Sequence, residues 1–331
     1  MEKETFKAYL VEEKEGKFVG KVQTKTIEDL PQGDLLIKVA YSSLNYKDAL
    51  SASGNKGVTR KYPHTPGIDA SGVVVQSENA AFKPDDKVIV TSYDLGMNTD
   101  GGFGEYIRVP SEWAVKLPEN LSLKEAMIYG TAGLTAGMSV LRLTELVKSE
   151  DDAIVVSGAT GGVGSLSIAI LSKLGYAVTA ITGKESEKEF LLQLGAKDII
   201  LRNEFEHQDK RPLLMSKFAG AIDTVGGAIL ENIIKSTKAM GVVTCCGNAA
   251  SPQLNLTVFP FILRGVSLIG IDSQNYPMTL REKVWNKLAK EWKPTQLLNT
   301  YNEITLEELP EKTDLMLQGK LKGRTIIKLS E

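Results

Sequence analysis

The residues best suited to chemistry form a glycine-rich loop between an apolar run and a helical pattern. The loop is Gly158-Ala159-Thr160-Gly161-Gly162-Val163-Gly164. Glycines let a backbone turn tightly and approach a pyrophosphate, whose charge is stabilised by N–H groups at the start of the next helix. A tight strand-to-helix turn without a ligand is the alternative interpretation. Because a strand, a helix and a second strand follow in the expected order, we predict a dinucleotide site here.

The residues after the second strand indicate which dinucleotide binds. A site for NAD would place Asp or Glu there to accept hydrogen bonds from the ribose hydroxyls. This chain has Thr182-Gly183-Lys184, and Arg202 follows the third strand. Hydroxyls and cations suit a 2′-phosphate, so the sequence favours NADPH. The alternative is that both cations are solvated surface charges, and Glu185 keeps it open.

Other reaction centres are absent from the sequence. It has no Gly-x-x-x-x-Gly-Lys-Ser/Thr phosphate loop, no Gly-x-Ser-x-Gly elbow and no Tyr-x-x-x-Lys pair. The two histidines, His64 and His207, are too few for a histidine-rich metal site. We expect His64 to be a loop residue and His207 to be exposed to solvent. Cys245 and Cys246 are adjacent, which excludes a disulfide framework, and we expect them in the core.

Two kinds of pattern must position these residues. From Phe6 to about Leu117, short runs rich in β-branched and aromatic residues alternate with turn clusters, which predicts a mostly β half and a small barrel. After Pro118, helical and strand patterns alternate, which predicts a parallel, doubly wound sheet. The predicted helices span 122–147, 161–174, 185–194, 228–239 and 279–292. The predicted strands span 152–157, 177–182, 198–201, 220–223, 241–246, 266–271 and 324–329.

Composition limits the partners of the chain. Its 331 residues suffice for about two domains, and 39 Lys and Arg against 41 Asp and Glu give a net charge of -2. That balance provides no broad basic field for nucleic acid or anionic membranes. The chain begins with charged and polar residues, and it contains no run of 18 apolar residues. The sequence therefore does not suggest secretion or insertion into a membrane. We expect a cytoplasmic protein.

Several longer strings carry a family resemblance. Together with the glycine loop, Pro66–Gly72 and Asp223–Gly227 resemble the medium-chain dehydrogenase/reductase superfamily. Three further strings resemble its zinc-free quinone oxidoreductase branch, closest to the NADPH-dependent acryloyl-CoA reductase group: Ser42–Leu50, Pro260–Arg264 and Gly270–Ser273. The resemblance implies an α/β fold, with a GroES-like β-barrel catalytic domain over 1–125 and 273–331. It also implies a Rossmann NADP-binding domain over 126–272 and a homodimer joined through the last Rossmann strand, Val266–Ile271.

The resemblance also implies a chemistry without metal. Zinc relatives place a cysteine where Asn45 stands and Gly-His-Glu where Gly67-Ile68-Asp69 stands, and this chain has neither. Without a Lewis acid, the expected reaction is hydride transfer from NADPH to a small molecule that accepts hydride readily: a quinone, an enone or an enoyl thioester. In that reaction Asn45 would donate from its amide, and Tyr46 would donate a proton or pack beside the nicotinamide. Asp48 would fix local geometry, because an ordinary aspartate is ionised at neutral pH.

The remaining implied roles are less specific. Asn248, Ile262 and Ser273 would surround the cofactor, whereas Lys320 departs from the polar amide of the group. A coenzyme A ester would bring phosphates, for which the candidate partners are Lys56, Arg60, Lys61 and Arg264; a solvated charged face is the alternative. The competing function is an NADPH-binding, crystallin-like or nucleic-acid-associated protein with little turnover.

Overall fold

The computed structural model describes residues 4–148, 153–206 and 209–330. By its internal contacts the chain divides into two compact units. The first comprises Met1–Thr131, Gln274–Ala289 and Tyr301–Glu331, and the second comprises Ala132–Ser273 and Lys290–Thr300. These contacts assign residues 126–131 to the first unit and 290–300 to the second, whereas the sequence placed the boundaries at 125 and 273.

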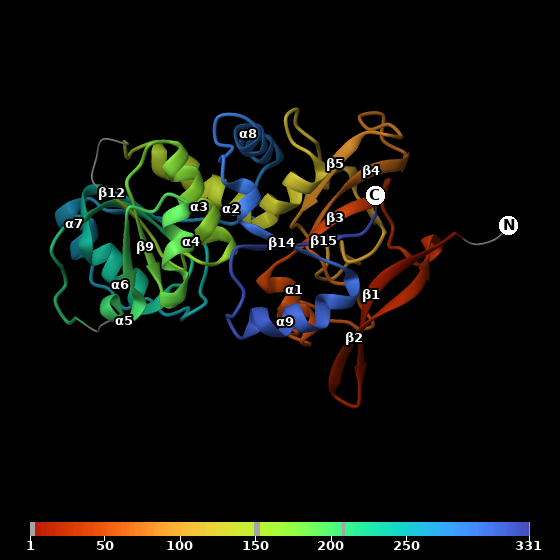
Figure 1. Cartoon of the computed structure of the whole chain (residues 1–331), viewed down its shortest axis with the longest axis horizontal. Helices are drawn as coiled ribbons and strands as arrows, with labels where there is room; N and C mark the ends of the chain where they lie inside the picture. Colours follow the sequence, from red (N-terminus) through yellow and green to blue (C-terminus); the bar gives the residue numbers. More distant parts are fainter. Residues whose placement is uncertain (1–3, 149–152, 207–208, 331) are drawn as a thin grey trace. The chain divides into compact units, whose positions relative to one another are not determined.

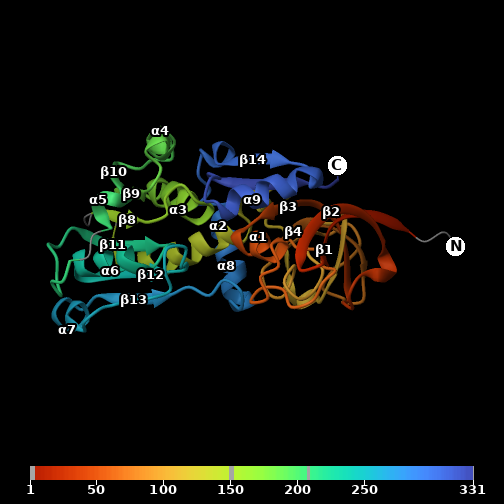
Figure 2. The same cartoon turned by 90° about the horizontal axis from the view of Figure 1, so that it is seen from below.

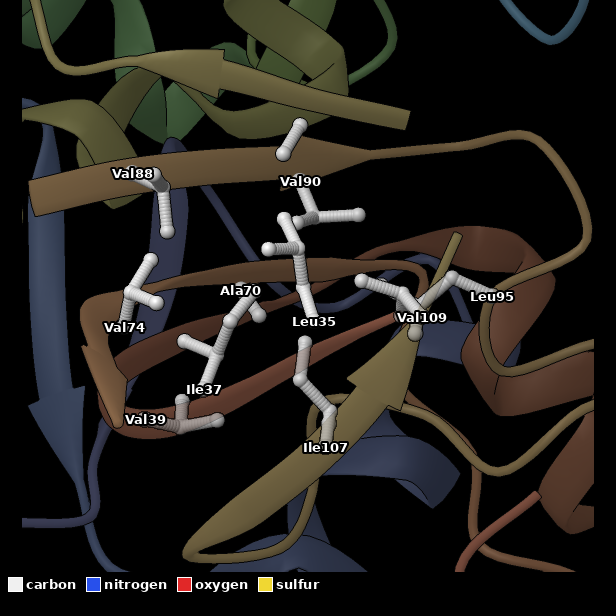
Figure 3. Close-up of a cluster of buried hydrophobic side chains, with 11 residues drawn as sticks. Leu35, Ile37, Val39, Ala70, Val74, Val88, Val90, Leu95, Ile107 and Val109 are labelled. Carbon is white, nitrogen blue, oxygen red and sulfur yellow. The ribbon is translucent and has the colours of Figure 1, made fainter. Parts of the chain in front are cut away.

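The first unit is built on a mostly antiparallel sheet, as the β-rich pattern predicts (Figure 1). Strands adjoin in the order β14-β15-β3-β4-β5-β7, and β6 also pairs with β3. Their bounds are β3 Leu35–Leu44, β4 Asp69–Ser77, β5 Lys87–Thr91, β6 Tyr106–Val109, β7 Ala114–Lys116, β14 Tyr301–Ile304 and β15 Arg324–Lys328. Alternate residues of β3, such as Leu35, Ile37 and Val39, are buried and point into a cluster with side chains of β4, β5 and β6 (Figure 3).

A long hairpin and several helices complete the first unit. The hairpin pairs β1, Thr5–Lys14, with β2, Lys17–Thr26. The helices are α1, Tyr46–Ala52, α8, Met278–Ala289, and α9, Leu309–Leu317, with 3-10 turns at Ile27–Asp29, Ser111–Trp113 and Leu306–Glu308. The sequence patterns missed α1 and α9 because each is short. Helix α8 was predicted at 279–292 and ends three residues earlier.

The second unit contains a parallel sheet in the order β10-β9-β8-β11-β12-β13 (Figure 2). Its strands are β8 Ile154–Val156, β9 Val178–Thr182, β10 Asp198–Leu201, β11 Phe218–Asp223, β12 Thr237–Cys245 and β13 Ser267–Gly270. In chain order the pattern is 3-2-1-4-5-6, the doubly wound arrangement that binds dinucleotides at the carboxyl ends of the strands. The fold class predicted from the alternation of helices and strands is confirmed.

The helices of this unit connect successive strands. They are α3 Gly162–Lys173, α4 Lys188–Gln193 after a 3-10 turn at Glu185–Glu187, α5 Arg202–Phe205, α6 Gly227–Ser236 and α7 Phe259–Arg264, with a 3-10 turn at Leu297–Asn299. The predicted helix 228–239 is too long, because β12 already begins at Thr237, which pairs with Phe218 of β11. In the described residues, no helix is long and apolar enough to cross a membrane.

One helix contains a break that matters for the site. Helix α2, Leu123–Thr144, starts in the first unit and continues into the second. At Gly130 the backbone leaves the helical conformation, with φ of 51° and ψ of -155°. A positive φ of this kind is strained for residues with a side chain, so the break requires glycine.

Candidate cofactor and catalytic site

The glycine loop of the second unit has the close backbone packing that a phosphate cradle needs. Gly158 has φ of 58°, and a Cβ there would lie 2.2 Å from Thr224 Oγ1. A Cβ on Gly164 would lie 2.3 Å from the carbonyl oxygen of Gly158. Side chains at either position would therefore push helix α3 away from the strands. These glycines allow the helix to begin directly beside the end of β8.

The start of α3 is left open for an anion. Gly161 is the N-cap residue, and within the described residues of this helix no acidic side chain lies in the first turn and no side chain caps it. The free N–H groups of the first turn and the helix dipole then favour a bound phosphate. Thr160 is buried, and the N–H of Ala159 donates to the carbonyl oxygen of Ile181 at 3.2 Å, which ties the loop to β9. The loop residues therefore fit a dinucleotide pyrophosphate.

Asp223 supports the loop from the neighbouring strand. Its buried carboxylate accepts hydrogen bonds from Ser157 Oγ at 2.6 Å and from the Gly226 N–H at 2.8 Å. Thr224 Oγ1 donates in turn to the carbonyl oxygen of Ser157 at 3.0 Å. Burial raises the pKa of Asp223. The string Asp223–Gly227, one of those that carried the family resemblance, therefore joins the ends of β8 and β11.

The predicted 2′-phosphate residues lie together at the end of β9. A Cβ on Gly183 would lie 3.0 Å from the guanidinium carbon of Arg202, so that guanidinium packs directly against the loop. The Lys184 N–H donates to Thr182 Oγ1 at 3.0 Å. The neighbouring Glu185 carboxylate pairs with Lys188 at 2.9 Å.

A cavity of about 600 Å³ opens at the carboxyl ends of β12 and β13. It is lined by Cys245, Cys246, Gly247, Asn248, Gly270, Ile271 and Asp272. Asn248 therefore lies at the carboxyl edge of the sheet, and Ser273 follows the last lining residue. Both cysteines are partly buried beside this cavity, and Cys245 packs against the buried apolar cluster of this unit, as expected of a core residue. Burial raises the pKa of Cys246 to about 12, so it is a thiol at neutral pH.

Ile262 does not lie at this edge of the sheet. Its helix, α7, is tied by the Arg264 guanidinium to the carbonyl oxygens of Lys235 and Thr237, at 2.8 and 3.1 Å. Thr237 is the first residue of β12, so α7 lies at the opposite end of the strand from Asn248. Figure 2 shows α7 at the start of the β13 arrow. Within this chain Ile262 therefore lies at the other end of the sheet from Asn248, and its cofactor role stays a prediction.

In the first unit, the three predicted catalytic residues lie at the start of α1. Tyr46 is the first residue of the helix and 52% exposed. Asp48 is fully buried and accepts N–H groups from Asn45 at 2.7 Å, Gly67 at 3.1 Å and Ile68 at 2.8 Å. This carboxylate caps the helix and joins it to the loop before β4, the geometric role expected for it.

The charge state of Asp48 differs from the sequence expectation. Burial, and then repulsion by Asp69, raise the pKa of Asp48 to about 7. The argument from an ordinary, ionised aspartate therefore does not hold in this environment. Asp48 can exchange a proton near neutral pH, although its oxygens face backbone donors.

Asn45 is fixed by buried partners. Its Nδ2 donates to Asp69 Oδ2 at 2.8 Å and to the carbonyl oxygen of Ser43 at 3.2 Å. Its Oδ1 accepts from Arg324 at 3.2 Å. Both amide hydrogens are thus used, so in this arrangement Asn45 has none to donate to a substrate oxygen. Its geometry fits a positioning role.

Sequence reasoning missed the residues that hold Asn45. Ser43 is a buried residue near the end of β3, and Asp69 and Arg324 each begin a strand. The signal available in the sequence was a polar residue next to apolar residues that are expected to be buried in a strand. Such residues need partners, but a pattern along the chain does not name them.

The proposed coenzyme A cluster is only partly available to a ligand. Lys56 pairs with Glu13 at 2.8 Å, and the Arg264 guanidinium is held by backbone carbonyls. Arg60, Lys61 and Lys320 are exposed.

His64 is buried in a loop, where one ring nitrogen contacts the carbonyl oxygen of Gly96 at 2.9 Å, and His207 lies outside the described residues. Within the described part of the chain, no group of three or more His, Cys, Asp or Glu residues could hold a metal ion.

Comparison with known families identifies both units. A family described as "Alcohol dehydrogenase GroES-like domain" matches residues 31–119, and one described as "Zinc-binding dehydrogenase" matches residues 162–290. "Putative quinone oxidoreductase YhfP" of Bacillus subtilis is 45% identical over 93% of this chain and 94% of its own length. "Acrylyl-CoA reductase AcuI" of Ruegeria pomeroyi is 39% identical over 97% of this chain and 98% of its own.

The chain belongs to the medium-chain dehydrogenase/reductase superfamily, in its zinc-free branch. Members of this superfamily use a nicotinamide cofactor. Most of the second match, residues 162–273, lies in the second unit, and residues 274–289 of it belong to the first. The resemblance stated from the sequence is confirmed.

Solved structures of medium-chain reductases agree with this fold. The YhdH oxidoreductase of Salmonella enterica in complex with NADP has a TM-score of 0.95 at 41% identity, covering 98% of this chain and 100% of that one. The YhfP protein of Bacillus subtilis with NAD bound has a TM-score of 0.96 at 44% identity, with the same coverage. The glycine cradle found here is consistent with either dinucleotide.

The raised pKa of Asp48 makes a prediction about stability. The native protein keeps this proton in the interval between about pH 4 and about pH 7, where the unfolded chain has lost it. The free energy of unfolding should therefore fall as pH rises through this interval, by at most about 1.4 kcal/mol per pH unit. Asp48→Asn cannot titrate, so the stability advantage of the wild type over this variant should be largest near pH 4 and smaller at pH 8.

Urea unfolding of both proteins across this pH range measures the difference. Asp85→Asn, at an exposed position where φ is 73°, controls for the loss of one surface carboxylate. Parallel pH profiles for the wild type and Asp48→Asn would contradict the assignment.

Proposed function

We propose that this chain transfers a hydride from NADPH to an activated double bond or a quinone, without a metal. The observation that carries the proposal is the pairing of an open phosphate cradle at α3 with Arg202 packed against Gly183. When bound, the nicotinamide supplies the hydride. The protein then has to orient the substrate and provide a proton for the reduced product.

The second strand of the nucleotide-binding unit supports NADPH over NADH. The end of β9 carries Thr182, Gly183 and Lys184, with no carboxylate among them to accept the ribose hydroxyls. The Arg202 guanidinium has a planar donor face suited to a phosphate. Its contact with Glu206, at 3.7 Å between Nε and the carboxylate, is long enough for a phosphate to compete. YhfP with NAD bound shows that a relative accepts the other dinucleotide, so the residues of this chain carry the argument.

Tyr46 is the proposed proton donor. Hydride addition to an enoyl thioester or enone gives an enolate, and addition to a quinone gives a phenolate; each takes one proton to complete the two-electron reduction. Tyr46 is half exposed at the start of α1, whereas Asn45 and Asp48 are held by buried partners. The names of AcuI and YhfP support these two substrate classes.

We also propose a cytoplasmic homodimer joined through β13. This strand ends the parallel sheet, and an unpaired edge is normally covered. Next to it, α7 and its N-cap residue expose a group of apolar side chains: Val258 at 62%, Ile262 at 66% and Leu263 at 64%. A second copy of the same face would bury them, which would give Ile262 a role in assembly. Two free cysteines suit the reducing cytoplasm.

The preference for NADPH is testable by equilibrium binding. NADPH should bind at least about tenfold tighter than NADH, a difference of about 1.4 kcal/mol. Lys184→Glu should remove that difference, because a carboxylate repels the 2′-phosphate. Lys173→Glu, at an exposed lysine in the last turn of α3, at the opposite end of that helix from the glycine loop, controls for charge reversal. Equal affinities of the unmutated protein would refute the preference.

Substrate class is tested by NADPH consumption at 340 nm with acryloyl-CoA and with 1,4-benzoquinone in parallel. A kcat/KM for the thioester that exceeds that for the quinone by several orders of magnitude would identify an acryloyl-CoA reductase. The reverse order would identify a quinone reductase. Tight NADPH binding without turnover of either compound would favour the crystallin-like alternative.

The role of Tyr46 is tested by Tyr46→Phe. Loss of a positioned proton donor should lower kcat by about 10²-fold while the melting temperature stays unchanged, because Tyr46 is half exposed. Tyr41→Phe, in the neighbouring strand of the same unit, is the matched control. Unchanged kinetics of Tyr46→Phe would assign Tyr46 to packing alone.

The dimer is tested by Ile262→Asp. A charge in the centre of the exposed α7 face should convert a dimer into monomers without unfolding the nucleotide-binding unit, as measured by sedimentation and NADPH binding. Leu192→Asp also replaces an apolar side chain by a carboxylate, at a residue of α4 that is 52% exposed. This control should leave the mass of the assembly unchanged. A monomeric wild-type protein would exclude this assembly.

A further inference from the structure

Behind the start of α1 lies a buried polar cluster, the Arg324 cluster, consisting of Ser43, Asn45, Asp69 and Arg324. None of these side chains is more than 9% exposed. They come from β3, the N-cap of α1, β4 and β15, which are brought together by the sheet of the first unit (Figure 1). A buried charged group is costly unless it is paired and hydrogen-bonded, so a cluster of this kind has to be closely satisfied.

The guanidinium of Arg324 is engaged at each of its nitrogen atoms. Nη2 donates to Ser43 Oγ at 2.7 Å, and Nη1 donates to Asn45 Oδ1 at 3.2 Å and to the carbonyl oxygen of Leu44 at 3.3 Å. Nε donates to the carbonyl oxygen of Ile128 at 3.0 Å. A planar fork with fixed donors matches this set, whereas a lysine ammonium would reach only part of it.

Asp69 is the anionic partner. Its Oδ2 lies 3.8 Å from Arg324 Nη2 and accepts hydrogen bonds from Ser43 Oγ at 2.5 Å and Asn45 Nδ2 at 2.8 Å. Its Oδ1 accepts from Thr131 Oγ1 at 2.6 Å. Ser43 therefore bridges the ion pair, and Asn45 contacts both charges, one with each end of its amide.

Gly130 closes the cluster from the break in α2. A Cβ at this position would lie 2.4 Å from Asp69 Oδ2, 2.5 Å from Ser43 Oγ and 2.8 Å from Arg324 Nη2. The break in the helix therefore gives the ion pair the space that a side chain would fill. The local backbone is adapted to the cluster as well as the side chains.

We propose that Arg324 is a positioning residue of the reductase site: through Asn45 and Ser43 it fixes the start of α1, and with it Tyr46. The inference rests on the proposed function, because it concerns the same site. Its second effect is electrostatic. Asp48 and Asp69 are both fully buried near the start of α1, and the guanidinium offsets the negative charge of Asp69 and, where it is ionised, of Asp48. Without that cation, negative charge developing on a substrate oxygen would meet a more negative site.

The test is Arg324→Ala with chemical rescue. This variant should lose at least about tenfold in kcat while its KM for NADPH stays within about twofold, since the nucleotide is held elsewhere. Guanidinium chloride at millimolar concentration should restore part of kcat, whereas urea, which has the same shape and no charge, should not. Both solutes destabilise proteins, so a rise in kcat with guanidinium alone reports the charge.

Arg281→Ala is the matched control. Arg281 is also fully buried in the first unit, where its Nη1 donates to Thr91 Oγ1 at 2.9 Å and its guanidinium lies over the Tyr93 ring. This variant should lose stability, and guanidinium should not raise its kcat. A loss of kcat in Arg324→Ala that guanidinium restores no better than urea overturns the proposal.

Ser43→Ala keeps the test decisive if Arg324→Ala fails to fold. It removes the hydroxyl that bridges the ion pair and leaves Arg324 in place. A folded variant with lower kcat and unchanged KM for NADPH supports the positioning role, and an unchanged kcat overturns it. If the wild-type protein binds NADPH and reduces no substrate, the proposed function is wrong. If the wild-type protein is active and the variants have the same kcat, only the positioning role is wrong.

Discussion

The Asp69 carboxylate is the constraint on which the catalytic half of the molecule depends. It is fully buried, so it must collect hydrogen-bond donors in place of water, and the donors come from separate parts of the chain. Hydrogen bonds to this carboxylate come from Ser43 in β3, from Asn45 at the N-cap of α1, and from Thr131, which directly follows the break in α2. Satisfying one anion therefore sets the register of a strand, the start of one helix and the break in another. The exposed Tyr46 takes its position from this arrangement because it directly follows Asn45.

The nucleotide-binding unit meets its main constraint with backbone atoms. A pyrophosphate needs several N–H donors at close range, and the glycine loop allows them only because Gly158 and Gly164 have no side chains to collide with Thr224 and the loop itself. Asp223 then holds the loop against the neighbouring strand through Ser157 and Gly226. Here a buried carboxylate again organises a turn, but its partners are close to one another at the strand ends.

The difference between these two constraints explains what the sequence could predict. The glycine loop, the strand before it and the helix after it are contiguous, so their spacing is visible along the chain, and the parallel sheet follows from the alternation of patterns. The Arg324 cluster joins residues that are 279 positions apart, as between Arg324 and Asn45. A single sequence shows that such residues are polar but not which partner each one has. Ile262 is a related case: a matching string does not show at which end of β12 its helix lies, and the Arg264 contacts do.

Asn45 shows why residue type alone was insufficient for assigning roles. An amide in a predicted site can serve as a donor to substrate, and the sequence offered no reason to prefer another role. In the structure the amide lies between a carboxylate and a guanidinium, so its two ends have opposite partners and its orientation is fixed. A buried ion pair with these partners contributes little net stability compared with apolar residues of similar volume, because desolvating the charges opposes their attraction. A cluster that is costly to bury and adjoins the exposed tyrosine is therefore better explained by the geometry it imposes on the start of α1 than by stability.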